Sequence, residues 1–139
     1  MFHYRKTRNR YMNFPKPEGC PFCDGLEAEK VVTETKYHRL VPNRVMYDLW
    51  ELRRVTQHLL LIPKRHVASL SQLTDEEKLD HINLIAKYEA DGFNIYARGV
   101  GSLQRSVAHQ HTHLIKTGRK QARGSFFIRK PYFLITFWR

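Results

Sequence analysis

The stretch SVAHQHTHLI, residues 106–115, carries a histidine at every second position: His109, His111 and His113. Residues 107–115 are predicted as a β-strand, in which alternate side chains share a face, so the three imidazoles would lie in a row ~7 Å apart. Such a row makes a poor apolar core, because each buried ring nitrogen needs a hydrogen-bond partner. The pattern therefore favours a chemical site over a packing layer.

Three interpretations of the row remain open: satisfied core histidines, a metal site, or a phosphate-transfer site. A metal site built only from these three is disfavoured, since imidazoles along one straight strand splay apart. A neutral imidazole, with an ordinary pKa of about 6.5, is a competent nucleophile at pH 7. A second histidine can then act as an acid or an anion binder.

The rest of the chain predicts few helices and several strands without regular βαβ alternation, which indicates an α+β fold with an antiparallel sheet. Besides the histidine stretch, strands are predicted at residues 30–35, 39–41, 58–62, 93–97 and 132–138. The strand at 58–62 is a nearly unbroken apolar run stopped by Pro63, so we expect it to be buried.

One main helix is predicted to start at the sequence TDEE, residues 74–77. This is a capping box, in which the Thr hydroxyl accepts from the amide of the second Glu while that Glu side chain reaches back. Leu79, Ile82 and Ala86 follow at helical spacing and predict the apolar face of the helix.

Composition bounds the class of protein. The chain has 139 residues, enough for one domain, and 42% hydrophobic residues, which excludes a disordered polyelectrolyte. Its 24 Lys and Arg against 13 Asp and Glu give a net charge of +11, which favours a polyanionic partner.

No apolar run approaches the ~20 residues of a membrane span and no signal core opens the chain, so a cytoplasmic protein without a membrane partner is expected. Residues 1–19 are predicted as a basic N-terminal arm and 20–139 as the folded domain.

The two cysteines, Cys20 and Cys23, are separated by two residues. In a chain without a secretory signal, this spacing indicates a metal half-site or a redox pair rather than a structural disulfide. Reduced thiols without a ligand are the remaining alternative.

The row of alternating histidines followed by Leu114 and Ile115 resembles the signature of the histidine triad (HIT) superfamily. Three further stretches agree with that family. LIPKRHVASL at residues 61–70 resembles its turn into the main helix, GFNI at 92–95 resembles the strand before its Gly-rich loop, and RSV at 105–107 lies where it has a phosphate-contacting serine. The resemblance runs from about Cys20 to Ile115.

The resemblance implies a HIT-like fold, with a five-stranded antiparallel sheet, one main helix and a shorter one, usually in a homodimer. It also implies a nucleotide hydrolase or nucleotidyltransferase that cleaves at the α-phosphate of dinucleoside polyphosphates, nucleotide phosphoramidates or adenylylated substrates. His111 would carry a covalent nucleotidyl group, His113 would bind phosphate and help protonate the leaving group, and Ser106 would donate to phosphate oxygens. The other nucleotide- or phosphate-binding candidates are Asn43, Asn94, Arg98, Gly99, Gln104 and Arg105.

The chain departs from the family pattern in the phosphate loop. Arg105 stands where Gln is usual, with Gln104 one residue early, and Arg98 stands where relatives often carry Asn. Arginine binds phosphate in a bidentate manner, although ordinary surface arginines are an equal interpretation. Asn43 resembles the Asn of the nucleotidyltransferase branches, so the choice between hydrolysis and transfer stays open.

In the zinc-bearing, bacterial-type branches, the two cysteines are joined by the histidine of the Pro-Lys-Arg-His turn and by the first triad histidine. The resemblance therefore implies a Zn²⁺ site formed by Cys20, Cys23, His66 and His109. Four protein ligands leave no open position, so this zinc would be structural. The remaining histidines are assigned to the surface or the core; they are His3, His38, His58 and His81.

The main alternative from another class is a nucleic-acid-binding module, or a protein that processes adenylylated nucleic-acid ends. Its support is the charge of +11, the aromatic and basic arm, and the terminal Phe137-Trp138-Arg139. A metal-dependent hydrolase is the third alternative.

Overall fold

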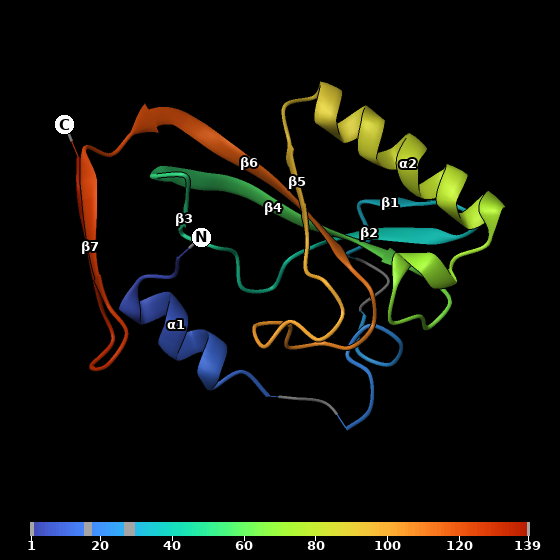
Figure 1. The fold of residues 1–139 in the computed structure, drawn as a ribbon, viewed down its shortest axis with the longest axis horizontal. Helices are drawn as coiled ribbons and strands as arrows, with labels where there is room; N and C mark the ends of the chain where they lie inside the picture. Colours follow the sequence, from blue (N-terminus) through green and yellow to red (C-terminus); the bar gives the residue numbers. More distant parts are fainter. Residues whose placement is uncertain (1, 16–17, 27–29, 139) are drawn as a thin grey trace.

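The computed structural model describes residues 2–15, 18–26 and 30–138, and its centre is a long antiparallel ribbon of β4 (Arg53–Pro63) and β6 (Thr112–Gln121) (Figure 1). The apolar run at 58–62 forms the buried half of β4 and ends at Pro63, as predicted. The sheet continues from β4 to β2 (His38–Pro42) and β1 (Thr33–Glu34), and from β6 to β5 (Asn94–Ala97). The antiparallel α+β prediction is therefore confirmed.

Across the described residues the main sheet has six strands, so the prediction of five is wrong. The additional strand is β3 (Leu49–Trp50), which pairs with the start of β4. The turn between them is made by Glu51 and Leu52, which have φ angles of 50° and 59°. Tight hairpin turns need positive φ, and the residues that signal them are Gly, Asn and Asp. Because neither residue is of that kind, this hairpin could not be predicted from its turn residues.

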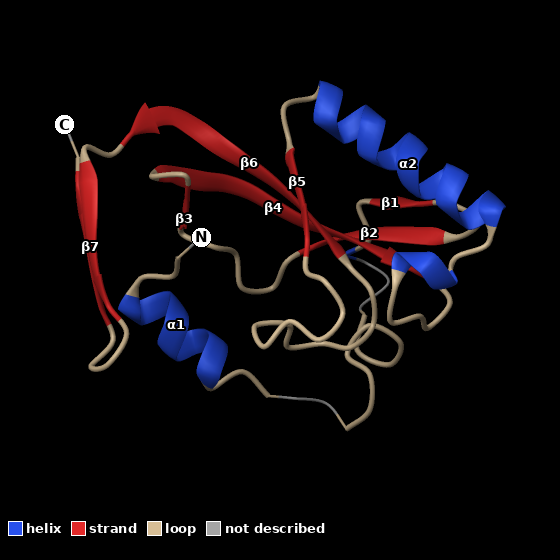
Figure 2. Ribbon diagram, in the orientation of Figure 1, coloured by secondary structure: helices blue, strands red, loops and turns tan. Residues whose placement is uncertain are grey.

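Helix α2 (Asp75–Ala90) lies along one face of the sheet (Figure 2). Its capping box is confirmed: the Thr74 hydroxyl accepts from the Glu77 amide at 3.3 Å, and the Glu77 carboxylate accepts from the Thr74 amide at 2.8 Å. The predicted apolar face is wrong, because Leu79 and Ile82 are 61% and 53% exposed.

The side of α2 that faces the sheet instead carries Leu84, Glu77 and His81, all of them buried. Leu84 packs into a core cluster with residues from β2, β4 and β6 and with the residue before β5; these are Leu40, Leu61, Leu114 and Phe93. The polar residues fit on this side because each has a specific partner, which hydropathy patterns do not detect. The opposite face of the sheet holds a smaller cluster, Val41, Leu60 and Ile62, on which Phe22 packs.

Segments near the two ends of the chain lie beside each other, since Phe2 packs on Phe127 and the Tyr132 hydroxyl donates to the His3 carbonyl. The basic arm contains the shorter helix, α1 (Arg5–Met12), and Phe2 pairs with Leu49 of β3. The predicted strand at 132–138 exists as β8 (Phe133–Phe137), but it pairs with β7 (Gly124–Ile128) in a separate two-stranded sheet. Among the helices of the described residues, none has the length and apolar character needed to span a bilayer.

Candidate active site and metal centre

The histidine stretch is not one continuous strand, so that prediction is wrong for residues 107–111, and β6 begins at Thr112. The preceding segment is held by the turn that follows β4 instead of by a strand ladder. The Gln110 amide donates to the Val67 carbonyl at 2.7 Å, and the His109 ring to the Pro63 carbonyl at 2.9 Å. The three histidines therefore do not form an even row: His109 is separated from the other two.

The backbone fixes the tautomer of His111. Its ring Nδ1 lies 2.8 Å from the carbonyl oxygen of His109. A carbonyl only accepts, so Nδ1 carries the proton and Nε2 keeps its lone pair. Burial lowers the pKa of His111, and the nearby charges of Arg105 and Arg98 lower it further. The ring is therefore neutral at pH 7 and its free nitrogen is available for attack.

His113 is held in the opposite tautomer by His58. The Tyr47 amide donates to Nδ1 of His58 at 3.2 Å, so the His58 proton resides on Nε2. That nitrogen lies 2.8 Å from Nδ1 of His113 and donates to it, which leaves the His113 proton on Nε2. Burial lowers the pKa of His58 to about 3 and that of His113 to about 2. With ring centroids 5.1 Å apart, His111 offers a lone pair and His113 an N–H donor.

Sequence reasoning assigned His58 to the surface or the core and so missed its role. The available signal was a single histidine at the head of the buried run 58–62, where a ring nitrogen requires a partner. Asn43, a predicted nucleotide-binding residue, lies against the same ring, with its amide nitrogen 3.3 Å from Nδ1, the nitrogen that accepts. In the structure Asn43 thus borders the histidine pair.

Aromatic side chains form a wall beside His113. Tyr47 stacks near its ring at 5.6 Å between centroids, and Tyr96 lies at 5.8 Å. Trp50 stacks on Tyr47 at 6.4 Å, and its Nε1 is buried without a hydrogen-bond partner among the described residues. Flat rings suit a nucleobase, which stacks on aromatic faces. The sequence pattern of residues 43–55 gave no indication of this wall.

The predicted phosphate loop joins β5 to β6 and is partly organised. Arg98 donates to the Gln104 amide oxygen at 2.9 Å and to the Tyr47 hydroxyl at 3.2 Å, so these residues come together beside the histidines. A Cβ added at Gly99 would meet nothing within 4 Å, and Ser106 is exposed in the same connection. Their contacts with a phosphate stay predictions.

Two other predicted ligands are engaged with the protein itself. Arg105 donates to the carbonyls of Ala68 and Ala108, each at 2.7 Å, and so fastens the segment before His109 to the turn after β4. Asn94 donates to the Ile115 carbonyl at 3.1 Å, at the end of β5 farther from His111. The structure therefore gives both side chains a bracing role.

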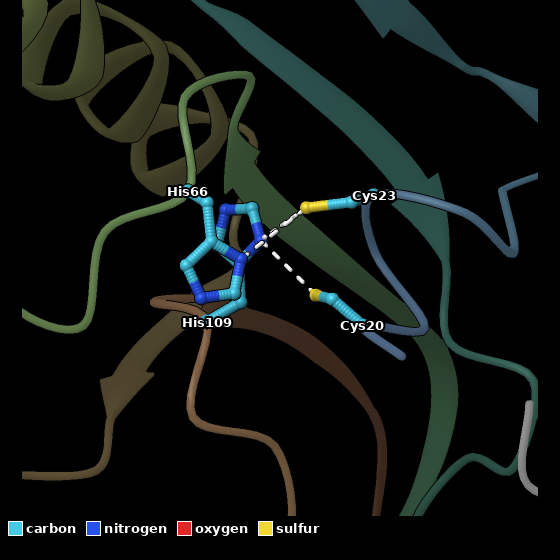
Figure 3. Close-up of side chains that lie close together, drawn as sticks. All are labelled: Cys20, Cys23, His66 and His109. Carbon is cyan, nitrogen blue, oxygen red and sulfur yellow. Dashed lines mark hydrogen bonds between the residues drawn. The ribbon is translucent and has the colours of Figure 1, made fainter. Parts of the chain in front are cut away.

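The four predicted zinc ligands come together (Figure 3). The donor atoms of Cys20, Cys23, His66 and His109 all lie within 4.8 Å of one another. Nδ1 of His109 is 3.5 Å from the sulfur of Cys20, and Nδ1 of His66 is 3.3 Å from that of Cys23. Because Nε2 of His109 donates to a carbonyl, its Nδ1 lone pair faces the sulfurs, as metal ligation requires. Two thiolates and two imidazoles match tetrahedral Zn²⁺.

The cysteine turn also touches the nucleophile. It is closed by backbone bonds from the amides of Cys23 and Asp24 to the Cys20 carbonyl, at 3.1 and 2.9 Å. Phe22, inside the turn, lies with its ring centroid 5.0 Å from that of His111 in an edge-on contact. The cysteine turn therefore contacts His111 directly through Phe22 and indirectly through His109.

A second hydrogen-bonded row braces the start of β6 from the α2 side. The Thr112 hydroxyl lies 3.2 Å from Nε2 of His81, Nδ1 of His81 lies 3.1 Å from Nε2 of His38, and Nδ1 of His38 lies 2.7 Å from the Asp80 carboxylate. A carboxylate only accepts, so Nδ1 of His38 carries a proton and donates it to Asp80, and each ring nitrogen of the two buried histidines has a hydrogen-bond partner.

Residues 53–120 match the HIT domain family. A histidine triad protein from Clostridium difficile is 26% identical over 79% of this chain and 99% of that chain, with a TM-score of 0.51. A HIT family hydrolase from Legionella pneumophila Philadelphia 1 is 23% identical over 75% and 96%, with a TM-score of 0.51. The diadenosine triphosphate hydrolase of Plasmodium falciparum, in complex with Cyclomarin A, is 18% identical over 86% of each chain, with a TM-score of 0.54. The fold is therefore similar to that of these HIT proteins, and residues 53–120 carry the match to the family.

Proposed function

We propose that this protein is a nucleotide hydrolase or nucleotidyltransferase that cleaves at an α-phosphate through a covalent nucleotidyl group on His111. The observation that carries the proposal is the pair of opposite tautomers, a free Nε2 on His111 beside an N–H on Nε2 of His113. HIT family hydrolases share the fold, and one of these relatives is a diadenosine triphosphate hydrolase.

In the first step, Nε2 of His111 attacks the α-phosphorus, the N–P bond forms, and the bond to the leaving group breaks. The N–H of His113 donates to a phosphate oxygen as negative charge redistributes. In the second step, water or another acceptor attacks the same phosphorus, the N–P bond breaks, and the acceptor proton leaves to solvent. The imidazole of His111 is then regenerated in its neutral form.

The low pKa of His113 bears on the leaving group. A ring whose pKa is about 2 is a hydrogen-bond donor but a poor source of an additional proton at neutral pH. A nucleoside polyphosphate departs as an anion without needing that proton, whereas the amine of a phosphoramidate needs one. We therefore rank dinucleoside polyphosphates above nucleotide phosphoramidates as substrates.

The resident metal in this proposal is Zn²⁺ bound by Cys20, Cys23, His66 and His109. It supplies structural order, since four protein ligands leave no position for water or substrate. Its effect on the reaction is to hold His109, whose carbonyl orients the nucleophile.

We also propose the homodimer that the resemblance implied. Two observations support it: β5 ends the strand order of the main sheet, and Leu79 and Ile82 of α2 are exposed. One chain has a mass of 16.6 kDa, and light scattering of the purified protein is expected to give twice that value. A single-chain mass at micromolar concentration would refute the dimer and leave the proposed chemistry intact.

The activity test uses zinc-loaded protein and a panel of diadenosine polyphosphates and adenosine phosphoramidate. The parent is expected to release AMP, fastest from the polyphosphates, and His111→Ala to release none. Lys36→Gln, at an exposed position before β2, is the matched control and keeps the parent rate. AMP release by His111→Ala at the parent rate, or none by the folded parent on the whole panel, would refute the proposed function.

A further inference from the structure

The C-terminal hairpin lies outside the residues that match the HIT family, and it presents an apolar sheet face. In the β7–β8 register, Phe126 lies opposite Ile135 and Ile128 opposite Phe133, so these side chains share one face with Phe137. All five are between 38% and 56% exposed. On the other face Leu134 is buried, and Phe127, 39% exposed, packs on Phe2 with ring centroids 5.0 Å apart. A contiguous exposed patch of large apolar side chains marks a binding surface more often than an accident of folding.

Basic and aromatic side chains are paired at both ends of β8. At one end the Arg54 guanidinium lies 5.2 Å from the Trp138 ring, above a cavity of about 500 Å³ that Thr56, Arg119 and Lys120 help to line. At the other end, the Arg8 guanidinium lies 4.4 Å from the ring of Tyr132, beside a cavity of about 310 Å³ shared by α1 and the hairpin. Tyr132 and Trp138 are six residues apart, a span of ~20 Å at ~3.3 Å per strand residue.

The C-terminal third of the sequence carries only positive charge, and the nearest acidic group, Asp48, already accepts from Tyr4 and Thr7 at the start of α1. The 48 residues after Asp91 contain no Asp or Glu, and they include nine Lys and Arg; these are Arg98, Arg105, Lys116, Arg119, Lys120, Arg123, Arg129, Lys130 and Arg139. Helix α1 adds Arg5, Lys6, Arg8 and Arg10. A second copy of the chain on the same face would bring like charges together, which disfavours self-association there. The occupant that complements this surface is a polyanion.

Among polyanions, single-stranded nucleic acid fits the pattern better than an anionic bilayer. A hairpin that enters a bilayer needs apolar residues at its tip, whereas this tip carries Arg129 and Lys130. Exposed aromatic rings interleaved with cations are what unpaired bases and their phosphates require, since every base can stack on a ring. We propose that the hairpin β7–β8, with the two cavities at the ends of β8, binds single-stranded DNA or RNA. This surface is independent of the proposed nucleotide chemistry.

The test is fluorescence anisotropy of the full chain with labelled oligo(dT) and oligo(U) of 20 nucleotides, at 50 to 200 mM salt. Both oligonucleotides are expected to bind more tightly than a 20-bp DNA duplex. The ratio of their two dissociation constants decides whether DNA or RNA is preferred. Arg119→Gln/Lys120→Gln, two exposed positions, is expected to weaken binding at 50 mM salt about tenfold or more. It should also reduce the slope of log affinity against log salt by about 1.4, or about 0.7 for each lost phosphate contact. Lys36→Gln/Lys87→Gln makes the same charge change away from the hairpin and should stay within twofold of the parent.

Trp138→Leu removes the stacking ring, and we expect a loss of roughly 5- to 100-fold. His111→Ala should bind as the parent does, so this outcome separates the surface from the catalytic proposal. Equal losses in the two double variants, or no binding at 50 mM salt, would overturn the proposal. The alternatives are that the parent binds phosphatidylserine vesicles or self-associates. If Phe126→Ser/Phe137→Ser abolishes either of these and leaves the oligonucleotide affinity unchanged, the proposal is also overturned.

Discussion

The replacement His58→Phe tests the argument that one buried ring sets the tautomer of another. Phenylalanine keeps the ring and opens no large cavity, but it removes both nitrogens. The Tyr47 amide then loses its acceptor and Nδ1 of His113 loses its donor. Each buried polar group left unsatisfied costs about 1–3 kcal/mol, so we expect the free energy of unfolding to fall by about 2–6 kcal/mol. A domain of this size remains folded after such a loss if its stability is about 5–15 kcal/mol.

Urea unfolding measures this cost, and Leu61→Ala is the matched control. Leu61 is fully buried on the α2 side of the sheet, and its truncation costs about 2–5 kcal/mol without removing a hydrogen bond to His113. We expect His58→Phe to reduce turnover by up to about 100-fold, the lower end of what a positioned proton donor contributes, whereas Leu61→Ala keeps most of it.

The tautomer itself is read from the ¹⁵N NMR shifts of the imidazoles. In the parent protein, His113 should show the proton on Nε2 alone, and in His58→Phe it should show a mixture of both tautomers. An unfolding free energy within 0.5 kcal/mol of the parent, together with an unchanged His113 spectrum, would refute the reasoning about His58.

Three further predictions concern the metal, the pH and the helix cap. Cys23→Ser should abolish the binding of one zinc ion per chain and lower the melting temperature measured with saturating zinc, since a ligand at 100 times its Kd stabilises by about 2.7 kcal/mol; retention of one zinc would contradict the site. Burial lowers the pKa of His81 to about 4, so below its ordinary 6.5 the unfolded chain takes up a proton that the folded chain does not. The free energy of unfolding should therefore fall with decreasing pH, and His81→Gln should lessen that slope by about 1.4 kcal/mol per unit between pH 6 and 5; an identical slope would count against the buried row. Thr74→Ala should cost about 0.5–2 kcal/mol in urea unfolding by removing the N-cap of α2, and an unchanged midpoint would contradict the capping box.

The sequence predicted best what rests on local chemistry. The capping box of α2 and the buried run at 58–62 follow from neighbouring residues, so both appear where expected. The Cys-x-x-Cys turn and the histidine of the turn after β4 were placed together only through the resemblance, since spacing along the chain does not bring residues 20 and 66 into contact.

The remaining features depend on contacts between distant segments. Alternating histidines predict a strand, but hydrogen bonds to the turn after β4 override that preference before Thr112. Hydropathy placed Leu79 toward the core, whereas His81 lies there because Thr112 and His38 satisfy its ring. The hairpin of β3 and β4, which brings Tyr47 and Trp50 to the site, has no turn signature in the sequence.

The most direct test of the proposed chemistry is the identity of the residue that becomes nucleotidylated. Zinc-loaded protein is mixed with a diadenosine polyphosphate, quenched within milliseconds in alkaline denaturant to preserve an N–P bond, and analysed by intact and peptide mass spectrometry. The proposal predicts a mass increase of one adenylyl group on the peptide that contains His111, absent from His111→Ala. Sustained AMP release with no adduct, or an adduct on another residue, would contradict it.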